Sequence, residues 1–165
     1  MIKKILITFF LCVFFSINSF AAGTSGGDDG TNKKKTNYDK AVIQIETAKK
    51  LEKKGKLEKA KKKYFKAQKL LIESNDNKPN KADTLNYLGF TTRKLGDYEN
   101  GEKYYLQGLE LEPNHIGINE YLGELYVVTN RIDLAKERLK VLKKCNCDEY
   151  SELKEIIAGT KKSKY

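Results

Sequence analysis

The feature that most restricts the fold of this chain is a sequence that repeats itself at an offset of thirty-four residues. Leu88-Gly89 recurs as Leu122-Gly123, and Gly96-Asp97 is matched by Asn130-Arg131. Asn, like Gly, tolerates a left-handed backbone, so the second pair indicates a tight turn in both copies. A period of this length is typical of helix-turn-helix units that stack, because each unit buries its apolar face only against its neighbours. We therefore expect an all-α chain.

The segment 82–115 carries further positions of a known repeat. Besides Leu88-Gly89 and the turn at 96–98, it has Tyr105 at the second aromatic position and Pro113 at the exit. On these residues it resembles the tetratricopeptide repeat (TPR) family. It departs from that family's pattern at three positions, which are Leu85, Gly101 and Gly108.

Two looser units flank this central one. The unit 116–149 has Asn119 at the first aromatic position and Cys147 where proline is usual. The unit 41–81 is out of step, and we expect its second helix to be longer, running to about Glu73. The resemblance thus implies a short right-handed α-solenoid of about three repeats, within a helical domain 38–158. Its expected helices are 38–54, 57–73, 82–95, 98–111, 116–129, 132–145 and a capping helix at 148–158, which Asn146 and Glu149 could begin as a capping box and Gly159 could end.

The N-terminal residues have the three parts of a secretory signal peptide. Lys3 and Lys4 precede an apolar run over 5–15, and small and polar residues follow up to Ala22. This run is much shorter than the roughly twenty residues of a membrane-spanning helix. We therefore expect residues 1–21 to be removed on export and the protein to be periplasmic, with a secreted or membrane-anchored protein as the alternative.

Two further segments have no apolar face to bury. The stretch 23–37 reads GTSGGDDGTNKKKTN, so we expect 22–37 to be a flexible linker. At the other end, 159–165 is a basic tail that we expect to be frayed.

Charge is unevenly distributed along the chain. From Lys33 to Lys69 there are fifteen lysines and four acidic residues, a net charge of +11, whereas 82–126 has a net charge of −5. Such a dipolar surface can steer a charged partner, and it could adhere to an anionic envelope surface. The alternative is an ordinary solvated lysine-rich helix face. Nucleic acid is not expected as a partner, because the protein is expected to be exported, only three arginines are present, and the lysine-rich helix face lacks interleaved aromatic residues.

The sequence contains no catalytic constellation. Its one histidine, His115, follows Pro113 in a predicted loop between repeats, and no serine or cysteine lies near it at a recognisable spacing. No glycine-rich phosphate loop is present, and too few cysteines and histidines occur together for a zinc site. We therefore expect no enzyme activity, no cofactor and no metal.

Cys145 and Cys147 are the only reactive pair outside the predicted signal peptide. An exported chain with two cysteines favours a disulfide between them. Free thiols, pairing between chains, and a thiol-redox function are the alternatives that the sequence leaves open.

The family resemblance also implies a binding surface, because the first helix of each TPR unit lines a concave groove. Carried onto 82–115 and 116–149, the groove positions give the candidate residues Asn86, Phe90, Arg93, Lys94, Glu120 and Glu124, and in the looser first unit they include Lys49 and Lys53. Phe90 would anchor an apolar side chain and Asn86 would hold a partner backbone. Because Glu120 and Glu124 would repel a carboxylate, we expect a mixed or basic partner segment. The alternative for Phe90 is packing between repeats.

These patterns favour a non-catalytic module or scaffold that binds a peptide or partner protein in the groove. The alternatives are a thiol-redox protein that uses Cys145 and Cys147, and adhesion to an anionic surface through the lysine-rich first repeat. The partner and the oligomeric state do not follow from the sequence.

Overall fold

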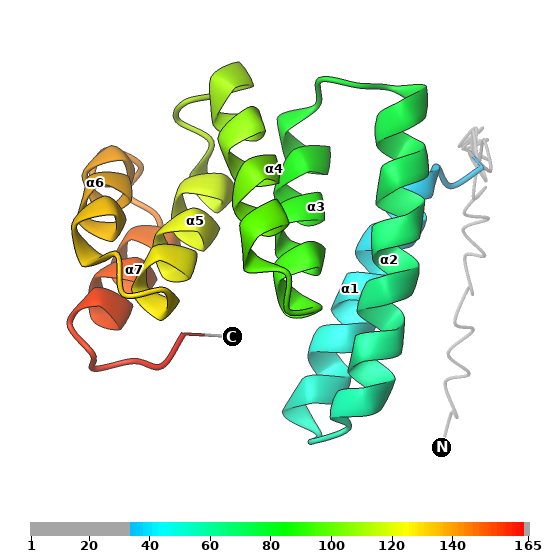
Figure 1. Ribbon diagram of the computed structural model, residues 1–165, viewed down its shortest axis with the longest axis horizontal. Helices are drawn as coiled ribbons and strands as arrows, with labels where there is room; N and C mark the ends of the chain where they lie inside the picture. Colours follow the sequence, from blue (N-terminus) through cyan, green and yellow to red (C-terminus); the bar gives the residue numbers. More distant parts are fainter. Residues whose placement is uncertain (1–33, 164–165) are drawn as a thin grey trace, which may run out of the picture. The chain divides into compact units, whose positions relative to one another are not determined.

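A computed structural model describes residues 34–163, and its helices belong to one compact unit, 34–165. Seven helices and no strand occur in this range (Figure 1). The predicted all-α fold is confirmed. The helices form three hairpins followed by a single helix, and their bounds are α1 Asn37–Lys53, α2 Leu57–Asn77, α3 Ala82–Lys94, α4 Tyr98–Leu111, α5 Ile116–Val128, α6 Ile132–Leu142 and α7 Asp148–Ile157.

The first hairpin differs from the sequence prediction at both ends. Its first helix begins inside the predicted linker 22–37, because the Thr36 hydroxyl accepts from the backbone of Asp39 and the Asp39 carboxylate accepts from the backbone of Thr36. This capping box satisfies two backbone N–H groups that a helix start would leave unpaired. The second helix, α2, extends to Asn77, past the predicted end near Glu73. The predicted signal peptide 1–21 lies outside the described residues.

The turn inside each hairpin is closed by a residue with a left-handed backbone. Gly55, Gly96 and Asn130 have φ values of 68°, 98° and 58°. The next residue then donates its N–H to a carbonyl five positions back, as in Asp97 to Thr92 at 3.2 Å. These bonds satisfy carbonyls at the helix end. The sequence match between Gly96 and Asn130 is therefore a match of backbone conformation.

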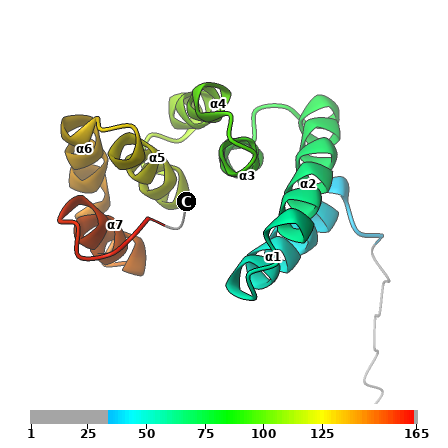
Figure 2. The ribbon, with the colours of Figure 1, turned by 60° about the horizontal axis from the view of Figure 1, so that its bottom comes forward.

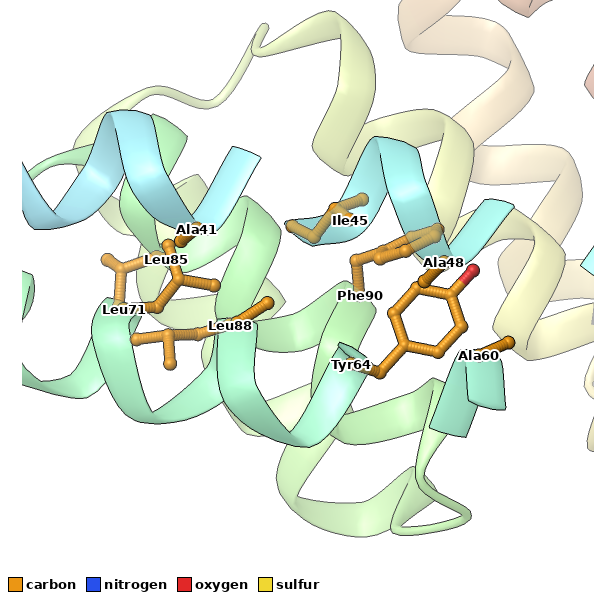
Figure 3. Packing of buried hydrophobic residues seen from close by; sticks show 10 residues of the cluster. Ala41, Ile45, Ala48, Ala60, Tyr64, Leu71, Leu85, Leu88 and Phe90 are labelled. Carbon is orange, nitrogen blue, oxygen red and sulfur yellow. The ribbon is translucent and has the colours of Figure 1, made fainter. Parts of the chain in front are cut away.

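Each hairpin packs on the next mainly through its second helix, with α2 against α3 and α4 against α5, and the first helices also touch one another. The helix α3 contacts both α1 and α5, and Figure 2 shows these three helices along one side, with α2, α4 and α6 along the other. The core of the first two hairpins contains Ile45 from α1, Tyr64 and Leu71 from α2, and Leu88 from α3 (Figure 3). Because α3 is covered by helices on several sides, most of its residues are buried, polar ones included.

Glycines allow the closest helix contacts. A Cβ atom on Gly89 would lie 2.5 Å from the ring of Tyr105, and one on Gly123 would lie 2.5 Å from a methyl carbon of Leu153. The Leu-Gly pair of the repeat thus marks the points where α3 meets α4 and where α5 meets α7. The helix α7 buries Leu153 and Ile156 against the last hairpin, as expected of a capping helix.

The ends of α7 correct two expectations. Its N-cap is Cys147, and no side chain caps it, because Asn146 lies before it in a left-handed turn with φ of 50°. The predicted capping box of Asn146 and Glu149 is therefore wrong, whereas Gly159 ends the helix as predicted, with φ of 74°. The described part of the tail is not frayed, since Lys161 pairs with Glu152 at 3.1 Å and Ser163 donates to Glu124 at 2.8 Å. Within the described range, no helix is long and apolar enough to span a membrane.

Candidate binding groove

A groove of about 530 Å³ lies along the first helices of the three hairpins. Residues of α1, α3 and α5 line it, and no residue of α2, α4 or α6 does. Its position follows from the stacking, which places the first helices side by side and leaves their inner faces open. The lining residues are Glu46, Lys49, Lys50, Glu52, Lys53, Phe90, Lys94 and Tyr121.

The floor of the groove is aromatic. The ring centroid of Phe90 lies 5.8 Å from that of Tyr64 and 5.1 Å from that of Tyr121, so Phe90 joins α2, α3 and α5. Figure 3 shows Phe90 beside Tyr64 among the buried residues of the first core. The Lys49 ammonium lies 5.1 Å from the centre of the Phe90 ring, within the range of a cation–π interaction. Phe90 is only 3% exposed, so it packs between the repeats. It also forms the base of the groove.

A chain of polar contacts forms one wall. The Tyr64 hydroxyl donates to Glu52 at 2.8 Å, and the Glu52 carboxylate pairs with Lys94 at 2.7 Å. Burial, and then the hydrogen bond to Glu52, raise the pKa of Tyr64 well above its usual value. Tyr64 is therefore neutral at physiological pH and can donate to the Glu52 carboxylate.

The open rim is basic. The side chains of Lys50 and Lys53 are exposed on α1, one turn apart, whereas Lys49 pairs with Glu46 at 3.4 Å. Lys94 is held by Glu52, so the two carboxylates in the groove are both engaged by lysines of the groove. The lining as a whole has four lysines and two glutamates, which is a net charge of +2.

Three of the predicted groove residues are buried and do not line the groove. Arg93, Glu120 and Glu124 are 2%, 4% and 0% exposed. Arg93 pairs with Glu124 at 3.4 Å and also donates to the backbone carbonyl of Tyr121. The Glu124 carboxylate accepts from Ser163 as well. The reason for expecting a basic partner segment is thereby removed, because neither glutamate presents its charge to the groove.

Asn86 lies one helical turn before Phe90 on α3 and is 7% exposed. Its Oδ1 atom has no hydrogen-bond partner among the described residues, and its Nδ2 atom lies close to Gly117 of α5. A buried amide oxygen without a partner is costly. Asn86 does not line the groove at Phe90, although both residues share one face of α3.

Sequence reasoning placed Phe90 and Lys94 in the groove but missed Tyr121 among the candidates. Tyr121 lies between the predicted positions Glu120 and Glu124 and turns its ring toward Phe90. It also missed the rim residues Lys50 and Glu46, because the first repeat is out of step and its groove positions could be placed only loosely. The lysine-rich end of α1 is the sequence signal that could have indicated this rim.

The remaining candidate groups lie away from the groove. Cys145 and Cys147 are joined by a disulfide at the start of α7, which leaves the predicted redox function untested. The His115 ring caps α5, since its Nδ1 atom accepts from the backbone of Ile118 at 3.2 Å, and its Nε2 atom contacts Asp83. Within residues 34–163, no group of His, Cys, Asp and Glu could hold a metal ion.

Neither a comparison with models of protein families nor one with curated proteins finds a match. A comparison with solved structures finds 55 matching chains. Among them is the first TPR of Spaghetti (RPAP3) bound to the HSP90 peptide SRMEEVD, which is 18% identical with a TM-score of 0.49 and covers 76% of this chain and 95% of that chain. The hairpins, their turns and their stacking define this chain as an all-α helical-repeat protein.

Proposed function

We propose that this protein is a non-catalytic interaction module that binds an extended segment of a partner protein in the groove formed by α1, α3 and α5. The observation that carries the proposal is the groove itself, which has an aromatic floor at Phe90 and Tyr121 and a charged rim. Aromatic side chains at the base of a pocket, surrounded by polar groups, are the usual anchors of protein interfaces.

The charge of the rim selects the kind of segment. Lys50 and Lys53 are exposed and stand one turn apart, whereas the carboxylates Glu46 and Glu52 are engaged by lysines. An acidic segment with an apolar residue would place its carboxylates at the two lysines and its apolar side chain on Phe90 and Tyr121. The proposed partner therefore differs from the mixed or basic one expected from the sequence.

The test uses a photo-crosslinking amino acid at position 53, followed by irradiation of cells and mass spectrometry of the products. We expect a cross-linked partner whose attached peptide is acidic. The same amino acid at position 140, an exposed site on α6, is the control and should not capture this partner. Adding Lys50→Glu should reduce the capture at position 53 several-fold by like-charge repulsion.

Two results would contradict the proposal. One is equal capture of the same partner at positions 53 and 140. The other is capture at position 53 that neither Lys50→Glu nor the control substitution Lys136→Glu on α6 changes. Phe90→Ala is a poor probe of binding, because Phe90 is buried in the core of the first two hairpins. Its truncation should lower the free energy of unfolding by about 3–5 kcal/mol.

The compartment is part of the proposal and rests on the sequence alone. Residues 1–22 have the charged start, short apolar run and small-residue exit of a signal peptide. We expect the protein in the periplasm to begin at Ala22, and intact-mass measurement of the envelope and periplasmic fractions checks this. A protein that keeps Met1 in the envelope fraction would instead be anchored.

A further inference from the structure

The outer face of α2 exposes three large apolar side chains. Leu57, Phe65 and Ile72 are 64%, 51% and 42% exposed. At 100° per residue, these positions fall within about 80° of one another around the helix, so they form one stripe. The face of α2 that is buried in the core, through Ala60, Tyr64, Ala67 and Leu71, is centred about 100° around the helix from the stripe, and the three side chains of the stripe remain exposed.

The stripe lies within a field of positive charge. From Leu57 to Ile72 the helix has six lysines and one acidic residue, Glu58. Lys61 lies inside the stripe, and Lys69 places its ammonium 4.7 Å from the centre of the Phe65 ring. Among the described residues, no acidic side chain forms an ion pair with Lys59, Lys61, Lys62 or Lys66, and all four are exposed.

We propose that this face of α2 binds the surface of a bilayer that contains anionic lipids. Leu57, Phe65 and Ile72 would enter the boundary between headgroups and acyl chains, and the surrounding lysines would contact lipid phosphates. A helix that combines an apolar stripe with lysines on its flanks has the composition of an interfacial membrane-binding helix. The long lysine stems allow the ammonium groups to remain at headgroup level while the apolar side chains lie deeper.

The charge distribution argues for this partner and for its orientation. The neighbouring outer helix α4 carries Glu99, Glu102 and Glu110 against Lys103, so its net charge is negative, opposite in sign to that of α2. An anionic bilayer would attract α2 and repel α4. The stripe lies on an outer helix, whereas the groove is lined by first helices only (Figure 2), so membrane binding goes beyond the groove's proposed function and leaves the groove open.

The test is sedimentation of the purified, cell-processed protein with vesicles made of equal parts phosphatidylglycerol and phosphatidylcholine. We expect binding that weakens as salt rises and that is absent from vesicles of phosphatidylcholine alone. The double substitution Lys62→Glu and Lys66→Glu should weaken binding at least about tenfold. Phe65→Ala should weaken it about threefold or more. These side chains are exposed, so far-UV circular dichroism should be unchanged.

A matched set on α6 controls for net charge and apolar exposure. Lys136→Glu with Lys140→Glu changes the charge equally, and Leu134, which is 37% exposed, is the counterpart of Phe65. All variants share one N-terminus, so differences among them report only the substituted helix. The proposal is overturned if the α6 variants lose as much binding as the α2 variants, or if the unmodified protein does not bind anionic vesicles at low salt.

A soluble polyanion separates lipid binding from simple charge attraction. Inorganic polyphosphate has the charge but no acyl layer, so Phe65→Ala should leave its binding unchanged while it weakens vesicle binding. If Phe65→Ala affects neither, the apolar stripe has no part and the bilayer is not the partner. The groove cross-linking at position 53 is a separate readout, and its outcome does not depend on the vesicle result.

Discussion

Gly89 and Gly123 occupy the same position of two repeats and meet different neighbours. The ring of Tyr105 faces Gly89 and is fully buried, so it has no space into which it can move. The atoms that face Gly123 are the terminal methyl groups of Leu153, which a rotamer change can displace. One sequence position thus carries two different packing constraints.

We predict that Gly89→Ala lowers the free energy of unfolding by about 1–3 kcal/mol through overpacking, despite the better helix propensity of alanine. Gly123→Ala should cost less than Gly89→Ala. Urea unfolding followed by circular dichroism measures both. A Gly89→Ala protein as stable as the unmodified one would mean that α3 and α4 do not approach as closely as their contact implies.

The pair of Arg93 and Glu124 is the most buried ion pair in the described range, with both side chains at 1% exposure or less. Removing one partner leaves the other charge in a site without water. We predict that Arg93→Met or Glu124→Leu alone lowers the free energy of unfolding by about 3–5 kcal/mol. The double variant should lose clearly less than the sum, which a double-mutant cycle in urea would detect. Additive losses would show that the two residues do not interact.

At the scale of elements, some helix starts have a side-chain cap and others do not. Asp97 caps α4 by accepting from the backbone of Asn100 at 3.1 Å, whereas Arg131 at the equivalent position of α6 provides no side-chain cap. Hydrogen bonds from the Asn100 side chain, and then from its backbone, lower the pKa of Asp97. The carboxylate form is therefore the one that stabilises α4.

We predict that Asp97→Ala costs roughly 0.5–2 kcal/mol at neutral pH. Because the pKa of Asp97 is lower in the folded state, its contribution is fully present above the ordinary carboxyl range and is lost as the pH falls through the lowered value. The stability difference between the two proteins should therefore shrink on acidification. Unfolding measured across a pH series checks this, and a difference that persists below that range would assign the cost to something other than the charged cap.

At the scale of the whole molecule, the hairpins depend on one another through α3, which packs against both neighbours. Leu88 lies at the centre of this packing and is 1% exposed, whereas Leu106 of α4 is 43% exposed. We predict that Leu88→Ala costs about 2–5 kcal/mol and that Leu106→Ala costs little. Thermal unfolding by circular dichroism compares them. Similar effects of the two substitutions would mean that the repeat register is wrong.

The repeat sequence by itself determined the all-α class, the hairpins and their turns. These follow from local causes: the period places apolar residues on one face of each helix, and Gly or Asn is required where the backbone is left-handed, as at Gly96 and Asn130. The end of α7 at Gly159 could be predicted for the same reason.

Only the tertiary structure decided which inner-face residues form the candidate site. Their positions within the repeat correctly predicted that Arg93 and Glu124 lie on the inner faces of α3 and α5. However, these helices lie close enough there for the two side chains to pair and exclude water. Exposure depends on what the neighbouring helix covers, and that helix is thirty or more residues away in sequence. For this reason Tyr121, Lys50 and Glu46 came to line the groove, and two predicted glutamates became part of the core.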